Sequence, residues 1–392
     1  MNNDKKKSAA EPIKILLWPT VTLFISLAAF YIGERVVVDP KQRTAIDEEA
    51  LRLFEGTASA VQKRRSAGED TKLDANVALV EAGVTEIGII IAPETGDEIR
   101  EAVGDGSQLG AQITYIPQAE PLGLAHAVLT AEEFLGDDSF VMYLGDNLLR
   151  DGITGLVEAF RSNEPDALIL LTEVVDPEHY GVAELDGERI VRLIEKPKDP
   201  PSNLALVGVY MFTSKVLEAA KAIEPSPRGE LEITDTIQHL IDTGHTVEQH
   251  RVRGWWKDTG QLADMLEANR LVLEDILSRS DGEVVDSKLE GRVIVEAGAR
   301  VVNSHVRGPA IIGSGSSVVD SYIGPYTAIA ADCEIANSEV EHSILLTGAS
   351  VRDLPSRMEA SLLGRHVSIA RAEGLPKTLR MLVGDRSEVT LP

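Results

Sequence analysis

From Gly282 onward the helical spacing of apolar residues ends, and large aliphatic residues recur at intervals of six. Small residues and glycines occupy many of the positions between them. A six-residue apolar period with intervening turns is typical of a parallel β-helix, in which each coil buries its apolar residues by stacking on the next. An ordinary antiparallel β-domain is the alternative fold. One such series, interrupted at Ser317, comprises Ile311, Ile323, Ile329 and Ile335.

Short apolar runs alternate with segments of helical composition between residues 76 and 281. Strands that are spaced by helices of this length favour a mostly parallel sheet with helices on both faces. We therefore expect an α/β domain in which ligands lie beyond the carboxyl ends of the strands. The predicted strands are residues 87–91, 113–116, 140–144, 167–172 and 204–212.

The N-terminal segment, residues 1–75, has a different character. Residues 15–33 contain no charged side chain, and three consecutive lysines precede them at positions 5–7. A run of this length is about what a helix needs to span a bilayer. The sequence therefore indicates a transmembrane helix at 15–33 that could tether the protein to a membrane. The alternative is a buried strand and helix of a soluble core.

Charge and cysteine content narrow the classes of partner. The chain carries a net charge of −25, which repels nucleic-acid backbones, so we expect no nucleic-acid partner. Small-molecule partners fit better, and bound phosphates would need metal ions to offset the repulsion. Acidity that serves only solubility is the alternative interpretation. The single cysteine, Cys333, excludes an intrachain disulfide and a cysteine zinc cluster.

Two aspartates are candidates for a metal site. Asp146 follows the apolar run 140–144 and a glycine, which places a carboxylate at the ligand edge of the predicted sheet. Such a position suits Mg²⁺, which takes few protein carboxylates and shares its other positions with water and phosphate. Asp258 lies in the run G-W-W-K-D-T-G at residues 254–260. Each aspartate alone could instead cap the next helix.

Further short motifs follow in a fixed order: I-P-Q at 116–118, P-L-G-L-A at 121–125, Y-G-V at 180–182, E-K-P at 195–197, G-V-Y at 208–210 and R-G-E-L-E-I-T-D at 228–235. Together with the two motifs that contain Asp146 and Asp258, this set of motifs resembles the sugar-1-phosphate nucleotidyltransferases, most closely the long form of glucose-1-phosphate thymidylyltransferase. The resemblance runs from about residue 78 to residue 388. It implies a Rossmann-like, mixed and mostly parallel sheet at 76–281, a left-handed parallel β-helix at 282–373 and a C-terminal tail at 374–392.

The resemblance also implies a nucleotide site and a metal site. Gln118 would hydrogen-bond the pyrimidine edge, because an amide can satisfy both a ring N–H and a carbonyl. Pro121 and Gly123 would let the backbone approach the base closely. Asp146 and Asp258 would hold Mg²⁺ between the phosphates of the nucleotide and of the sugar. The substrates would be dTTP or UTP and a hexose-1-phosphate.

A hexose site is implied by the remaining motifs. Lys196 would neutralise the sugar phosphate, and it would act as a catalytic residue together with the two aspartates. The product of dTTP and glucose-1-phosphate would be dTDP-glucose, with pyrophosphate released. The β-helix would serve formation of a homo-oligomer. The residues implied to line the hexose are Tyr180, Gly181, Glu195, Lys196, Gly208 and Tyr210.

The resemblance does not extend to residues 1–75, where the family's phosphate-binding run G-G-x-G-T-R-L-x-P has no counterpart. We therefore expect a non-family N-terminal segment and a transferase domain that lacks its first strand and its phosphate loop. One alternative is a catalytically inactive sugar-nucleotide-binding or scaffold protein. Another is a β-helix acyltransferase that uses His305, His342 or His366. Because nucleoside triphosphates are cytosolic, we expect a cytoplasmic body, tethered to a membrane or not.

Overall fold

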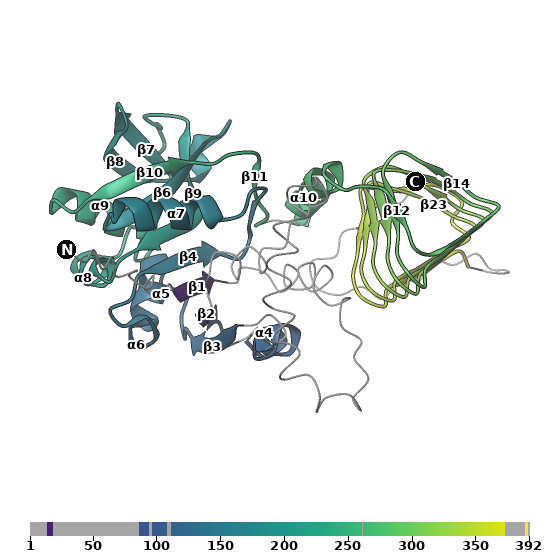
Figure 1. Ribbon diagram of the computed structural model, residues 1–392, viewed down its shortest axis with the longest axis horizontal. Helices are drawn as coiled ribbons and strands as arrows, with labels where there is room; N and C mark the ends of the chain where they lie inside the picture. Colours follow the sequence, from purple (N-terminus) through teal and green to yellow (C-terminus); the bar gives the residue numbers. More distant parts are fainter. Residues whose placement is uncertain are drawn as a thin grey trace, which may run out of the picture. The chain divides into compact units, whose positions relative to one another are not determined.

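The computed structural model describes residues 14–18, 86–93, 96–107, 111–260, 262–372 and 389–390 (Figure 1). The described residues up to Gly260 belong to one compact unit. The described residues from 262 onward belong to a second unit. The expected boundary at 281/282 therefore lies later in the chain than the observed one. The helix α10, Leu262–Glu274, belongs by its contacts to the second unit.

The first unit is built on a nine-stranded sheet. Its main path has the order β10-β6-β9-β4-β1-β2-β3, and the hairpin β7–β8 joins at β9. β9 runs antiparallel to β4 and β6, while the pairs on the β1, β2 and β3 side are parallel, so the expected mixed sheet is confirmed. The strands are β1 Lys14–Trp18, β2 Glu86–Ile91, β3 Gln112–Pro117, β4 Phe140–Leu144, β6 Ala167–Glu173, β7 Gly181–Asp186, β8 Arg189–Glu195, β9 Leu204–Phe212 and β10 Val247–Arg251.

Helices cover both faces of this sheet, as the alternation of elements predicts. Two separate apolar clusters form because neighbouring residues of a strand point to opposite faces. One cluster contains Met142 with side chains of α5, α8 and α9, and the other contains Val141 with side chains of α4 and α7. The helices are α4 Gly96–Val103, α5 Leu124–Thr130, α6 Glu132–Leu135, α7 Thr154–Asn163, α8 Lys215–Ala222 and α9 Ile233–Asp242, with a 3₁₀ turn at Pro177–His179.

β1 corrects two expectations. It lies between β2 and β4 and runs parallel to both, with Ile15 and Leu16 essentially inaccessible to solvent. Lys14 fastens its start by donating to the carbonyl of Phe134 at 2.8 Å and by pairing with Asp138 at 2.9 Å. The N-terminal segment thus supplies a central strand, and residues 15–18 of the expected membrane helix are a strand.

A buried parallel strand and a membrane helix cannot be told apart by the apolar run alone. A parallel strand that is buried on both faces is a continuous apolar run, just like the start of a membrane helix. Residues 1–13 and 19–85 lie outside the described residues, and with them the rest of the expected span and of the segment 1–75. Among the helices that the structure describes, none is long and apolar enough to cross a membrane.

The second unit is a left-handed parallel β-helix with three flat faces (Figure 1). The first face consists of β12 Arg279–Ser280, β15 Val293–Val295, β18 Ala310–Ile312, β21 Thr327–Ile329, β24 Ile344–Leu345 and β27 Leu362–Leu363. The second consists of β13 Glu283–Val285, β16 Arg300–Val302, β19 Ser317–Val319, β22 Glu334–Ala336, β25 Ser350–Arg352 and β28 Ser368–Ala370. The third consists of β14 Lys288–Glu290, β17 His305–Arg307, β20 Tyr322–Ile323, β23 Glu339–Glu341 and β26 Met358–Glu359.

The coil length differs from a strict multiple of six. Partner residues on neighbouring coils are mostly 17 positions apart, as Arg300 and Ser317 are. The step from the second face to the third is one residue short of a six-residue repeat. This corner contains a residue with a positive φ, for example Asp320. Ile311 therefore points outward, where it packs against Leu273 and Ile276 near the end of α10. The fully buried residues of consecutive faces are instead Val306, Ile312, Val318, Ile323, Ile329, Ile335 and Val340.

Candidate active site

Two short strands bring the predicted aspartates together. Asp146 lies in the turn between β4 and β5, Asn147–Leu149, and Asp258 is the last residue of β11, Trp256–Asp258. β5 and β11 pair antiparallel, with Asp258 opposite Asn147. The amide and the hydroxyl of Thr259 both donate to the carbonyl of Asp146 at 2.8 Å. These bonds fasten segments that are more than a hundred residues apart in the sequence.

Both carboxylates lie close to Gly260. A methyl group placed on Gly260 would lie 3.3 Å from Oδ1 of Asp258 and 3.9 Å from Oδ2 of Asp146. The amide of Gly260 also donates to Oδ1 of Asp258 at 2.9 Å, so both aspartates lie beside this glycine. Two facing carboxylate oxygens at the ligand edge of a sheet can hold a divalent cation whose other ligands come from phosphate and water. Among the described residues, no group of three or more His, Cys, Asp or Glu side chains forms a closed metal cage.

Asn147 connects the parts of this site, and sequence reasoning did not single it out. Its Nδ2 donates to Oδ1 of Asp146 at 2.8 Å, and its Oδ1 accepts from the amide of Gly208 at 3.0 Å and from Nε1 of Trp256 at 2.7 Å. The side chain is buried. A Cβ on Gly208 would lie 2.6 Å from Nδ2 of Asn147, so Gly208 is needed for packing against this amide. The sequence signal for this role is the position of Asn147 directly after Asp146.

Tyr210, expected to line the hexose, lies in the core beneath the carboxylates. Its ring stacks on Phe212 with centroids 5.9 Å apart. Burial raises the pKa of its phenol, and the nearby charges of Glu195, Asp146 and Asp258 raise it further. The phenol therefore stays neutral. The same three carboxylates give the site a negative field that favours a bound cation.

Glu195 is held at the other side of the site. It is the partner of Gly181 in the β7–β8 hairpin, and its Oε2 accepts a 2.5 Å hydrogen bond from Oγ1 of Thr234. Burial raises the pKa of the Glu195 carboxyl, the Thr234 bond opposes this, and the charge of Glu232 adds to the rise. A methyl group on Gly181 would lie 3.2 Å from both oxygens of this pair. Sequence reasoning quoted the motif that contains Thr234 but did not assign the residue a role.

Tyr180 directly precedes β7, and Lys196 directly follows β8. Lys196 is exposed, has a φ of 41°, and donates its amide hydrogen to the carbonyl of Tyr180 at 3.0 Å. The ring of Tyr180 meets that of Trp256 edge-on, with centroids 5.6 Å apart. Because Trp256 also donates to Oδ1 of Asn147, it connects Tyr180 to Asn147. Nearby, Arg228 forms a close ion pair with Glu232 at 2.9 Å.

The predicted nucleotide residues form one loop after β3. Gln118 is buried, and its Nε2 lies 2.8 Å from Nδ1 of His126 and 3.5 Å from the carbonyl oxygen of Gly123. Gly123 has a φ of 103°, and a Cβ there would lie 2.4 Å from the carbonyl oxygen of Leu231. Pro121 is exposed in the same loop. Sequence reasoning did not identify His126, which lies in the first turns of α5.

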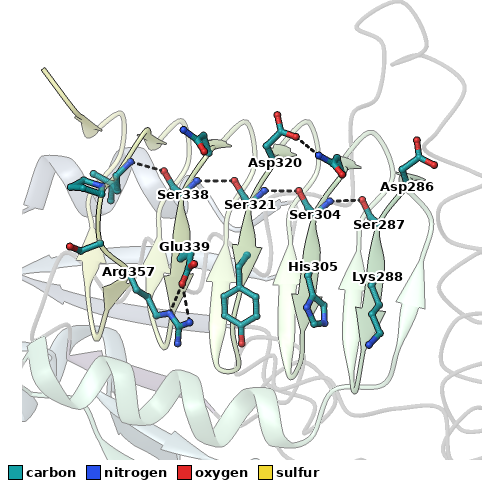
Figure 2. A pocket seen from close by; sticks show the side chains of 16 residues that line it. Asp286, Ser287, Lys288, Ser304, His305, Asp320, Ser321, Ser338, Glu339 and Arg357 are labelled. Atoms are coloured by element: carbon teal, nitrogen blue, oxygen red, sulfur yellow. Dashed lines mark hydrogen bonds and ion pairs between the residues drawn. The ribbon is translucent and has the colours of Figure 1, made fainter. Parts of the chain in front are cut away.

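A groove of about 1060 Å³ runs along the second-to-third corner of the β-helix (Figure 2). A ladder of serines forms its floor, in which each serine Oγ accepts the backbone amide of the serine one coil on. His305 lines the groove, lies 2.8 Å from Glu290 and meets the ring of Tyr322 edge-on. The other two histidines considered for acyl transfer, His342 and His366, lie at corners with positive φ.

Comparisons with known proteins identify the family of the chain. The model of the nucleotidyl transferase family matches residues 50–275, so the match begins inside the segment 1–75 that the motifs had left outside. A glucose-1-phosphate thymidylyltransferase of Streptomyces griseus is 51% identical over 79% of this chain and 87% of its own length. One of Streptomyces antibioticus is 52% identical over 80% and 88%. A low-salt glycan biosynthesis nucleotidyltransferase, Agl11 of Haloferax volcanii, is 49% identical over 80% and 89%. The chain belongs to the sugar-1-phosphate nucleotidyltransferase family, the group that includes these thymidylyltransferases.

Proposed function

We propose that the protein transfers the nucleotidyl group of dTTP to glucose-1-phosphate, giving dTDP-glucose and pyrophosphate. The observation that carries this proposal is the convergence of Asp146 and Asp258 above Gly260 at the carboxyl edge of the sheet. The two Streptomyces relatives are named for this reaction. A UTP–glucose-1-phosphate uridylyltransferase of Haloferax volcanii is 36% identical over half of this chain, which makes UTP the second candidate nucleotide.

The donor set fits Mg²⁺. Magnesium prefers hard oxygen ligands, and it binds through one or two carboxylates plus substrate phosphates and water. Asn147 occupies Oδ1 of Asp146, while Oδ2 faces the space above Gly260. Asp146 and Asp258 would therefore hold the ion, which when bound neutralises phosphate charge and orients the phosphates.

The proposed reaction needs no general base. A phosphate oxygen of glucose-1-phosphate attacks the α-phosphorus of dTTP, and the bond from that phosphorus to the bridging oxygen of the β-phosphate breaks. The attacking group is already an anion, so the barrier consists of charge repulsion and alignment. Lys196 would offset the charge of the sugar phosphate at the mouth of the site.

The hexose would bind beside Glu195. This carboxylate accepts one hydrogen bond from Thr234 and has acceptor capacity left for sugar hydroxyls. Gly181 keeps the adjacent space free of a side chain. Tyr210 lies beneath and supports these groups. We also propose that the flat faces of the β-helix are the surfaces through which copies of the chain associate.

Incubation with dTTP, glucose-1-phosphate and Mg²⁺ tests the proposal. We expect dTDP-glucose and pyrophosphate in equal amounts, and no product after chelation of the metal. Calorimetry with dTDP-glucose distinguishes the alternative of an inactive binder, for which the sugar nucleotide would bind without any turnover. The absence of turnover by the folded protein would contradict the proposal, whether or not the sugar nucleotide binds.

A further inference from the structure

The side-chain amide of Asn147 has one possible orientation. One end of it lies 3.0 Å from the backbone nitrogen of Gly208 and 2.7 Å from Nε1 of Trp256. A backbone N–H and an indole N–H can only donate, so the atom that meets both must be the oxygen Oδ1. The NH₂ end therefore faces Asp146, where an ionised carboxylate oxygen accepts at 2.8 Å.

This bond limits how the carboxylate of Asp146 can turn. Its Oδ1 is held by Asn147, and its Oδ2 lies on the side of Gly260, 3.9 Å from the position of an added methyl group. An amide oxygen has two lone pairs, and Gly208 and Trp256 occupy both in the case of Asn147. The indole N–H is thus one of the two groups that keep the amide, and through it the carboxylate, in place.

Trp256 also connects the two segments that carry the aspartates. It lies on β11 together with Asp258, and Asn147 of β5 is the residue paired with Asp258. Residues two apart in a strand share a face, so Trp256 lies diagonally across from Asn147, within reach of an aromatic side chain. Its hydrogen bond therefore runs from the strand of one aspartate to the residue next to the other.

We infer that Trp256 is a positioning residue of the metal site, because its N–H, acting through Asn147, orients the carboxylate of Asp146 toward the ion. The inference rests on the proposed function, in which Asp146 and Asp258 hold Mg²⁺. The role belongs to the indole N–H and is separate from the edge-on contact of the ring with Tyr180. Removing a group that orients a metal ligand typically weakens metal binding about 10- to 100-fold.

The test is the variant Trp256→Phe, which keeps an aromatic ring beside Tyr180 and removes the N–H. Calorimetric titration of the full-length protein with Mg²⁺, in the presence of dTDP-glucose and corrected for the binding of Mg²⁺ by the nucleotide alone, gives the metal affinity. The N–H acts one step away from the ligand, so we expect a loss of about three- to tenfold. A smaller folded fraction would change the stoichiometry and leave the affinity unchanged.

The matched control is Trp255→Phe, the same substitution one residue earlier. The oxygen of Asn147 is already occupied by Gly208 and Trp256, so this variant should change the affinity for Mg²⁺ by less than about twofold. Equal losses in Trp255→Phe and Trp256→Phe would overturn the inference, because the effect would then not depend on the bond to Asn147.

A double-mutant cycle with Asn147→Ala tests the route of the effect. Once Asn147 is truncated, Trp256→Phe should cause no further loss of affinity for Mg²⁺, because the N–H has no partner left. Additive losses would overturn the inference. Excess Mg²⁺ should also restore the rate of the single variant Trp256→Phe. A deficit that persists at saturating Mg²⁺ would place the role of Trp256 in the hexose pocket instead.

The outcomes for the inference and for the proposed function are distinct. If the wild type forms dTDP-glucose and Trp256→Phe binds Mg²⁺ as tightly as the wild type, the inference is wrong and the proposed function stands. If the affinities change as expected and the folded wild type forms no product, the proposed function fails and the positioning role stands. If the wild type binds no Mg²⁺, both are wrong.

Discussion

Oδ2 of Asp146 and Oδ1 of Asp258 both lie close to Gly260, where a methyl group would lie 3.9 Å from the first and 3.3 Å from the second. The carboxylates come from segments that the β5–β11 pair and Thr259 hold together. Because the space between them is kept open by the absence of a side chain, the site can be perturbed without removing either ligand.

Gly260→Ala should therefore weaken Mg²⁺ binding about 10- to 100-fold, the range seen when groups next to metal ligands are changed. Calorimetric titration with Mg²⁺ in the presence of nucleotide measures this. The control is Gly155→Ala in α7, where an added methyl group has no neighbour within 4 Å. Equal metal affinity in the two variants would show that the space above Gly260 holds no ion.

Asn147→Ala should lower the free energy of unfolding by about 2–4 kcal/mol, because it leaves the buried N–H of Gly208 and the partly buried N–H of Trp256 without their acceptor. Urea denaturation measures the change. Asn163→Ala removes an exposed amide that donates to Glu248 and should cost less than about 0.5 kcal/mol. A similar cost for both variants would argue against the connecting role of Asn147.

Glu195→Gln should change how stability depends on pH. Burial raises the pKa of the Glu195 carboxyl above its ordinary value in the folded protein. A raised pKa contributes stability that is present below the ordinary value and is lost as the pH rises through the folded value. The wild type should lose this contribution as the pH rises from the ordinary glutamate pKa through the raised pKa of Glu195, and the variant, which can still accept from Thr234, should not.

Denaturation of both proteins across that range measures the effect. The stability of Glu195→Gln relative to the wild type should increase with pH. Glu133→Gln, at an exposed glutamate of α6, provides the control and should show a much smaller trend. A relative stability that falls with rising pH would contradict the assignment of Glu195 as a buried carboxyl with a raised pKa.

Leu16→Ala tests whether the N-terminal segment supplies a central strand. The side chain is 1% exposed within β1, so its truncation should cost about 2–5 kcal/mol. Val175→Ala, at a side chain that is 94% exposed, should cost less than about 0.5 kcal/mol. Urea denaturation compares them. If Leu16→Ala is as mild as Val175→Ala, Lys14–Trp18 is not part of the sheet.

The sequence predicted the fold classes because both depend on periodicity. Alternating apolar runs and helical segments indicated a helix-covered sheet, and the recurrence of aliphatic residues indicated the β-helix. The true coil length was missed because one corner is shortened by a residue with positive φ, such as Asp320, and periodicity does not register that. Ile311 shared the apparent phase of the core residues and yet packs outward against α10.

The candidate site was only partly predictable. Asp146 and Asp258 stood out because a carboxylate after a strand or within a glycine-flanked run is conspicuous. Asn147 and Thr234 act through other residues, by hydrogen bonds between distant segments, and no sequence spacing reports such contacts. The same limit applies to β1, whose buried residues give an apolar run that is compatible with a strand or a membrane helix.

The most direct test of the central claim is product formation by the wild type and by Asp146→Asn under identical conditions. With dTTP, glucose-1-phosphate and Mg²⁺, the wild type should form dTDP-glucose. Asp146→Asn, which replaces one facing carboxylate by a neutral group, should be slower by about 10³-fold. Equal rates for the two proteins, or no product from a folded wild type, would contradict nucleotidyl transfer at this aspartate pair.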